Sequence, residues 1–150
     1  MENGMKALEQ NYRKGTLEVV DLPHPKATFG RVVVRTAASL ASVGTEKAMV
    51  ELARKSLIGK ARARPDLVKQ VLDKVRTDGM LETWRQVMGR LETPIQIGYS
   101  SAGTVIEVSP GVDGFRTGDR VACTGSGYAG HAEVTSVPAK LCALVPDEVD

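Results

Sequence analysis

Two periodicities of hydrophobic and polar positions divide the chain. Apolar and polar residues alternate near the beginning of the chain and again over its last third, a pattern typical of β-strands. Between these parts, from Glu46 to Leu91, apolar residues recur every three or four positions, as they do in amphipathic helices. The pattern predicts a mainly β (α+β) fold with a helical segment inserted between strands.

The strand-like segments are short and are separated by glycine or proline. Met5–Gln10 and Thr16–Leu22 flank a turn at Lys14-Gly15, and β-branched residues dominate Arg31–Ala38. The prolines at positions 23 and 25 exclude a central strand there, since proline donates no ladder hydrogen bond. Further strands are expected along the run that starts at Gly98, and at Arg120–Thr124, Tyr128–Val137 and Leu141–Val145.

The helical segment carries three apolar stripes, separated by Gly59, Pro65 and Gly79. Pro65 suits a first helical turn, and Thr45 is a candidate N-cap for the first helix. We therefore predict a three-helix insertion over residues 46–94. The stripes are Met49, Val50, Ala53 and Leu57; Leu67, Val68, Val71, Leu72 and Val75; and Met80, Leu81, Trp84, Val87, Met88 and Leu91.

Charge is distributed unevenly along the chain. The net charge of the whole chain is only +2, but residues 54–76 hold eight basic and two acidic side chains, a local charge of +6 that leaves −4 elsewhere. A solvated helix face and a contact with an anionic substrate both fit this cluster. Nucleic acid fits it poorly, because aromatic residues that could stack on bases make up only 4% of the chain. We expect no nucleic-acid partner.

The composition and the first residues of the chain indicate where in the cell the protein is expected. A content of 42% hydrophobic and 25% charged residues is ordinary for a globular protein, and no apolar run approaches the ~20 residues that span a bilayer. The first residues have no apolar core of the signal-peptide kind. We expect a cytoplasmic protein without a membrane partner, in which the two cysteines, Cys123 and Cys142, stay reduced.

One stretch of 24 residues, Gly98–Val121, combines several specific features. An alternating strand is followed by turn residues at Ser109-Pro110-Gly111 and Asp113-Gly114, and then by the tetrad Gly118-Asp119-Arg120-Val121. This order resembles the GroES-like catalytic domain of the medium-chain dehydrogenases/reductases, which include the zinc-type alcohol dehydrogenases. The resemblance extends over Met5 to about Glu148, apart from the helical segment. It implies a GroES-like, partly open β-barrel, and the three-helix segment predicted from the periodicity would be an insertion in this barrel.

A glycine motif near the C-terminus invites a nucleotide-binding interpretation. Gly125–Gly130 spells G-x-G-x-x-G, which binds a dinucleotide when a helix follows and presents its N-terminus to the pyrophosphate. Here His131–Val137 follows, and it alternates like a strand. We therefore interpret the motif as a barrel loop and assign no cofactor-binding residue to this chain.

The resemblance also directs attention to catalytic zinc. Zinc-dependent relatives have a cysteine where this chain has Val43, and histidine and glutamate where it has Tyr99 and Ser100. Valine has no donor atom, and tyrosine and serine are poor zinc ligands beside thiolate and imidazole. We interpret Cys123 and His131, two further ligand types, as packing residues. The chain is thus similar to a subgroup that lacks the catalytic zinc ligands, and we predict no zinc.

Four residues are candidate catalytic residues: Thr45, Glu46, Tyr99 and Ser100. Thr45 matches the hydroxyl that relays a proton from the substrate alcohol in zinc-dependent relatives, and Tyr99 would supply a phenolic donor to the same cleft. The alternatives are that Thr45 caps a helix, that Tyr99 fills the former metal cavity, and that Glu46 interacts only with the helix dipole.

The leading interpretation is the substrate-side catalytic domain of a zinc-independent oxidoreductase that uses NAD or NADP. The resemblance implies a small-molecule substrate, with anionic or sugar-derived compounds from sugar or polysaccharide metabolism as candidates. It also implies a nucleotide-binding Rossmann domain after residue 150, without which this chain would be inactive. The helical insertion would serve as a lid or as a homodimer contact. The alternative is a non-catalytic GroES-like binding or assembly module.

Overall fold

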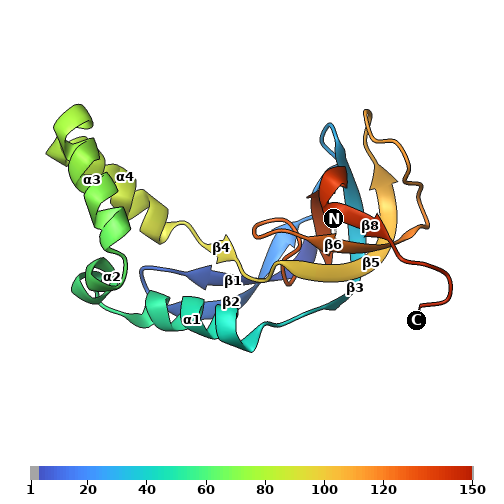
Figure 1. Ribbon diagram of the computed structural model, residues 1–150, viewed down its shortest axis with the longest axis horizontal. Helices are drawn as coiled ribbons and strands as arrows, with labels where there is room; N and C mark the ends of the chain where they lie inside the picture. Colours follow the sequence, from blue (N-terminus) through green and yellow to red (C-terminus); the bar gives the residue numbers. More distant parts are fainter. Residues whose placement is uncertain (1–3, 150) are drawn as a thin grey trace. The chain divides into compact units, whose positions relative to one another are not determined.

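The structure, a computed structural model, describes residues 4–149, which form two compact units (Figure 1). The first unit combines Met1–Glu9, Glu18–Val43 and Gln96–Asp150, and contains most of the strands. The second combines Gln10–Leu17 and Gly44–Ile95, and contains the helices. The division follows the change of periodicity in the sequence.

The strands and helices follow the order that the sequence pattern predicts: three strands, then all the α-helices in one continuous block, then the remaining strands. The strands are β1 (Gly4–Asn11), β2 (Thr16–Pro23), β3 (Arg31–Ser39), β4 (Ile95–Gln96), β5 (Ser100–Val108), β6 (Arg120–Thr124), β7 (Val134–Pro138) and β8 (Cys142–Leu144). The helices are α1 (Val43–Arg54), α2 (Leu57–Ala63), α3 (Pro65–Asp78) and α4 (Met80–Glu92), and a 3-10 turn, η1 (Ala139–Leu141), precedes β8.

A five-stranded antiparallel sheet with the order β7-β3-β5-β6-β8 forms the core of the first unit. Strand β3, which lies between β7 and β5, is buried on both faces over Val32–Val34. Val32 and Val34 point to one hydrophobic cluster, which includes Val105 of β5, while Val33 points to a second cluster that includes Met5 of β1. Because side chains alternate across a strand, this double burial explains the uninterrupted valine run in the sequence.

A second sheet has three strands in the order β2-β1-β4. Strand β2 lies at its edge and ends at Pro23, as expected for a residue that cannot donate a ladder hydrogen bond. Within residues 4–149 the two sheets do not close into one barrel. The predicted α+β, GroES-like, partly open architecture is confirmed.

The helical insertion is confirmed as well, but it contains four helices instead of three. The first apolar stripe is divided between α1 and α2, because Ser56 begins a new helix by accepting a hydrogen bond from the backbone N–H of Gly59 (3.2 Å). Gly59 therefore lies inside α2, not between helices. Pro65 occupies the first turn of α3 and Gly79, at φ 85°, separates α3 from α4, both as predicted.

Two boundaries differ from the sequence prediction. Helix α1 begins at Val43, so Thr45 lies in its first turn and is not the N-cap. The strand predicted over Tyr128–Val137 begins only at Val134, because the chain turns through Gly130. A side chain at Gly130 would approach the carbonyl oxygen of Ile97 to 2.9 Å, so only glycine fits this turn without displacement. No helix within residues 4–149 has the length and apolar character needed to cross a membrane.

Candidate functional site

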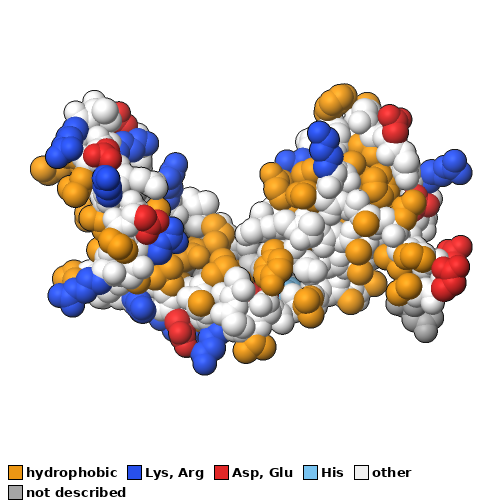
Figure 2. Space-filling model, in the orientation of Figure 1, with side chains coloured by type: hydrophobic (Ala, Val, Ile, Leu, Met, Phe, Trp, Pro, Cys, Tyr) orange, Lys and Arg blue, Asp and Glu red, His pale blue; other side chains and the backbone are white. Residues whose placement is uncertain are grey.

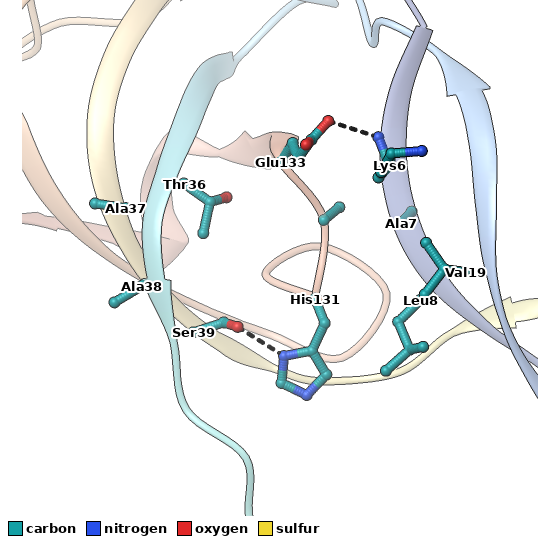
Figure 3. Close-up of a pocket in the computed structure, with 11 residues that line it drawn as sticks. Lys6, Ala7, Leu8, Val19, Thr36, Ala37, Ala38, Ser39, His131 and Glu133 are labelled. Carbon is teal, nitrogen blue, oxygen red and sulfur yellow. Dashed lines mark hydrogen bonds between the residues drawn. The ribbon is translucent and has the colours of Figure 1, made fainter.

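A cleft of about 380 Å³ opens on the first unit between β1, β3 and the segment that leads into β7 (Figure 3). Small apolar residues form much of its wall, and a few polar groups point into it. The residues that line it are Lys6, Ala7, Leu8, Val19, Thr36, Ala37, Ala38, Ser39, His131, Ala132 and Glu133.

Ser39 and His131 point toward one another across this cleft, and Ser39 Oγ lies 2.8 Å from His131 Nδ1 (Figure 3). The backbone holds the histidine in place. Its N–H donates to the carbonyl oxygen of Ile97 (2.9 Å), and its own carbonyl accepts from the N–H of Leu8 (2.8 Å). Gly98, at φ 94°, packs against the imidazole so closely that a Cβ there would lie 3.0 Å from the ring. Hydrogen bonds thus fix the backbone of His131, while Ser39 and Gly98 border its ring.

Glu133 is fixed on the opposite side of the cleft by Lys6 and Thr36. The Lys6 N–H donates to Glu133 Oε2 (2.7 Å), the Glu133 N–H donates to the carbonyl of Lys6 (2.9 Å), and the Thr36 N–H donates to the carbonyl of Glu133 (2.9 Å). The hydroxyl of Thr36 is buried and hydrogen-bonds to none of the described residues. Thr36 therefore contributes to the wall of the cleft, while its hydroxyl oxygen is closed to solvent.

Tyr99 and Ser100, two of the predicted catalytic residues, lie directly after Gly98 but do not line the cleft. Both are half-buried. The carbonyl of Tyr99 accepts from the N–H of Gly125 (2.8 Å), and the carbonyl of Ser100 accepts from the N–H of Leu40 (3.0 Å). Their backbone therefore connects the start of β5 to Leu40 and to the turn at Gly125. Their catalytic role stays a prediction.

Thr45 and Glu46, the other two predicted residues, belong to the second unit. They lie in the first turn of α1, where Thr45 is exposed and Glu46 is half-buried. An acidic side chain at this place interacts favourably with the positive end of the helix dipole. The helix dipole is thus a structural reason for an acidic residue at position 46. The catalytic role of Glu46 and the proton-relay role of Thr45 both stay predictions.

The residues at the expected zinc position do not fit a zinc ion. Val43 offers no donor atom and its side chain is 79% exposed at the start of α1. Tyr99 and Ser100 provide only hydroxyl oxygens, which are poor ligands for zinc. Over residues 4–149, no three side chains of histidine, cysteine, aspartate or glutamate converge into a possible metal site.

The G-x-G-x-x-G segment does not fit a dinucleotide either. Gly125–Gly130 folds as a tight turn in which the N–H groups of Tyr128 and Ala129 both donate to the carbonyl of Gly125 (3.1 and 2.9 Å). The next regular element is strand β7, as predicted, so no helix N-terminus is available for a pyrophosphate.

Thr36, Ser39 and Glu133 are not among the site residues predicted from the sequence, and His131 is predicted there only as a packing residue. The polar residues of the cleft lie far apart in the sequence, with 92 positions between Ser39 and His131. The one signal in the sequence is Gly98, which directly precedes Tyr99 and Ser100. Because glycine has no side chain, its backbone can approach another group closely, and here that group is His131.

The second unit contains an apolar groove of about 440 Å³. Its walls come mainly from apolar residues of α2, α3 and α4, which therefore face one another. Lysine and arginine side chains flank hydrophobic ones over these helices (Figure 2). Lys60 and Arg64 lie at the groove, and burial lowers the pKa of Lys60, whose ammonium group donates to the carbonyl of Tyr12 (2.6 Å).

Comparison with solved structures shows the same fold in several oxidoreductases. The chain is similar to a mycobacterial quinone oxidoreductase (24% identity, TM-score 0.61), covering 97% of this chain and 35% of that protein. It is similar to a mycobacterial protein solved with NADPH (24%, TM-score 0.60, covering 97% and 34%). A third match is an alcohol dehydrogenase superfamily protein from Novosphingobium aromaticivorans (25%, TM-score 0.60, covering 97% and 36%). The chain thus spans little more than a third of each of these proteins.

Comparison with curated proteins found no match. Residues 70–147, just over half of the chain, match the alcohol dehydrogenase GroES-like domain. This range begins inside α3 and runs through β8, and so contains the loop at Gly98, the Gly-Asp-Arg-Val tetrad and His131. The chain therefore belongs to the alcohol dehydrogenase GroES-like domain family.

Proposed function

We propose that this chain is the substrate-side domain of a zinc-independent, NAD(P)-dependent oxidoreductase of the medium-chain dehydrogenase/reductase type. The observation that carries the proposal is a GroES-like domain in which Val43, Tyr99 and Ser100 occupy the expected zinc-ligand positions. A similar fold in a mycobacterial protein solved with NADPH supports the nicotinamide cofactor. The cofactor would supply or accept a hydride, and this chain would bind and orient the substrate.

A second domain is part of the proposal. The only dinucleotide-like motif among the described residues lacks the helix that such a site needs. A Rossmann domain following residue 150 would provide the cofactor site, and the chain alone would be inactive. The chain spans 34–36% of the solved proteins described above, which leaves room for such a domain in a protein of that size.

The substrate we propose is a small polar molecule with a carbonyl or alcohol group, and sugar-derived compounds are the first candidates. The cleft offers the hydroxyl group of Ser39 and the imidazole of His131 within a wall of alanines. The imidazole of His131, which Ser39 orients through Nδ1, would exchange a proton with the substrate oxygen. In the absence of zinc, such a proton donor would stabilise the charge that develops on this oxygen.

A complete polypeptide, extended through any domain that follows residue 150, tests the proposal. We expect it to oxidise NADPH or NADH in the presence of a carbonyl substrate from a panel of aldehydes, quinones and keto sugars. Elemental analysis of the untagged protein should show far less than one zinc per chain, and chelator treatment should leave the rate unchanged. Stoichiometric zinc would contradict zinc independence, and a protein without any nicotinamide-dependent turnover would favour the binding-module alternative.

A further inference from the structure

Strands β6 and β8 bring the two cysteines of the chain directly opposite one another. Cys123 and Cys142 are register partners in this antiparallel pair, and both are free thiols. Their sulfur atoms lie 3.7 Å apart. Neither residue lines the cleft described above, so their proximity has no explanation in the proposed reaction.

The position of the pair within the ladder favours a bond between them. The N–H of Val145 donates to the carbonyl of Arg120 (2.9 Å), which identifies those two residues as a hydrogen-bonded pair. Hydrogen-bonded and non-hydrogen-bonded pairs alternate along an antiparallel ladder. Three positions further, Cys123 and Cys142 therefore form a non-hydrogen-bonded pair, where Cα atoms are only about 4.5 Å apart and side chains come closest.

This separation falls within the range of disulfide bonds, whose Cα atoms are roughly 4.4–6.8 Å apart. A disulfide length of about 2.05 Å requires the two sulfurs to approach by roughly 1.7 Å from their 3.7 Å separation. Side-chain rotations can produce most of that movement without a change of register. The backbone is thus already arranged for a cross-link.

The two thiols differ in access and in acidity. Cys123 is 3% exposed within the larger core cluster, whereas Cys142 is half-buried at its margin. The hydrogen bond between the two thiols lowers the pKa of Cys142, and the same hydrogen bond, together with burial, raises the pKa of Cys123. Cys142 is therefore the thiol that ionises first and that a reagent reaches first.

We propose that Cys123 and Cys142 are a modification site that forms a reversible intramolecular disulfide with a low-molecular-weight disulfide as oxidant. The thiolate of Cys142 attacks one sulfur of the oxidant and releases one thiolate from it. The thiol of Cys123 then loses its proton and attacks Cys142 Sγ, which releases the second thiolate. Two protein thiols are oxidised by two electrons and one disulfide is reduced to two thiols, so the exchange balances.

The bond would connect the edge strand β8 covalently to β6, the strand that pairs with β5 at Ser100 and Ser101. A packing role alone predicts something different, because a buried cysteine then behaves as a small apolar residue and stays reduced. The two interpretations are distinguished by the chemistry of the thiols, without an assay of activity.

Incubation of the reduced chain with glutathione disulfide, followed by denaturing alkylation and mass spectrometry, tests the proposal. We expect both thiols to be lost, the monomer mass to fall by two hydrogen atoms, and the tryptic peptides of Cys123 and Cys142 to be joined. The chain has no other cysteine, so the result is unambiguous. Thiols that stay free under these conditions, or bonds found only between chains, would overturn the proposal.

Two serine variants test the order of the steps. Cys123→Ser should accumulate one glutathione on Cys142, because no second thiol is present to release it. Cys142→Ser should leave Cys123 reduced, with a labelling rate at least about tenfold lower than that of Cys142 in the first variant. Equal rates in the two variants, or no adduct in the first, would overturn Cys142 as the attacking thiol.

Discussion

Ser39 Oγ and His131 Nδ1 are joined by a 2.8 Å hydrogen bond, although 92 positions separate the two residues in the sequence. The bond connects the last residue of β3 to the segment that precedes β7, and these strands are neighbours in the five-stranded sheet. Neither residue carries a recognisable motif. The sheet order places them together, and the cleft around them depends on that order.

The first prediction concerns catalysis by His131. In the complete enzyme, His131→Ala should lower kcat by roughly 10²–10⁴-fold, which is the usual contribution of a positioned proton donor. Ser39→Ala removes only the bond that orients the ring and should cost less. Steady-state kinetics measure both effects. The exposed His24 provides the matched control, since His24→Ala should leave kcat unchanged. Equal effects at the two histidines would contradict the role of the cleft.

The second prediction tests the close approach of Gly98 to the histidine. Gly98→Ala should reduce activity and stability together, because its Cβ would meet the His131 ring at 3.0 Å and its φ of 94° is strained for alanine. Gly114→Ala is the control, since φ is 83° there but nothing lies within 4 Å. We expect a loss of about 2–4 kcal/mol at Gly98, against roughly 1 kcal/mol at Gly114, by urea denaturation. Equal losses would mean that the ring moves aside at no cost.

The third prediction concerns the cofactor. The isolated chain should bind NADPH or NADH weakly or not at all, because the turn at Gly125–Gly130 leads into a strand. Fluorescence titration measures this directly. A micromolar dissociation constant, about −8 kcal/mol, would show that the glycine motif had been wrongly excluded, even if the complete enzyme used the cofactor as proposed.

The fourth prediction is a pH dependence of the second unit. The hydrogen bond and charge of Arg64 lower the pKa of Asp66, in the first turn of α3. A carboxyl whose pKa is lower in the folded state stabilises that state above its unfolded pKa, near 4. This contribution should disappear as the pH falls through the lower, folded-state pKa.

Circular dichroism at 222 nm over an acid titration measures this loss of helix. Asp66→Asn should reduce the loss of helix at acid pH, because the variant has no carboxyl group at position 66 to protonate. Asp73→Asn in the middle of the same helix serves as the control and should retain it, since Asp73 pairs with Arg76 and the Arg64–Asp66 pair is unchanged. Identical acid titrations of the wild type and Asp66→Asn would contradict the assignment.

The fold could be predicted largely from the sequence because its signals are local. The alternation around Val105, the valines of β3, and the glycines and prolines at turns each define an element without reference to the rest of the chain. The division of the first apolar stripe into α1 and α2 was missed because one serine decides it. Ser56 caps α2 through a single side-chain hydrogen bond, which competes with continuation of the helix.

The candidate site was harder to predict because it is not local. The positions compared with zinc ligands directed attention to Tyr99 and Ser100, whereas the polar groups of the cleft come from β1, β3 and the segment before β7. Thr36 shows the difficulty. Within β3 it continues a strand pattern, and only the packed structure shows that its hydroxyl is buried without a partner among residues 4–149.

The last prediction concerns Trp84, the single tryptophan of the chain. If the helical insertion buried it, Trp84→Ala would destabilise the protein by about 3–5 kcal/mol. In this chain Trp84 is 58% exposed at the apolar groove of the second unit. We therefore expect a cost below about 2 kcal/mol, because little apolar area is lost from the core and alanine favours the helix.

The predicted homodimer contact can be tested with the same variant. If the groove is that contact, Trp84→Ala should shift sedimentation equilibrium toward the monomer. Leu81→Ala is the matched control, because Leu81 is similarly exposed (65%) on the same helix but does not line the groove. If both variants weakened the dimer equally, the contact would involve the surface of α4 outside the groove as much as the groove itself. A wild-type protein that stays monomeric would exclude the dimer, and a large loss of stability in Trp84→Ala would instead indicate that the ring is buried.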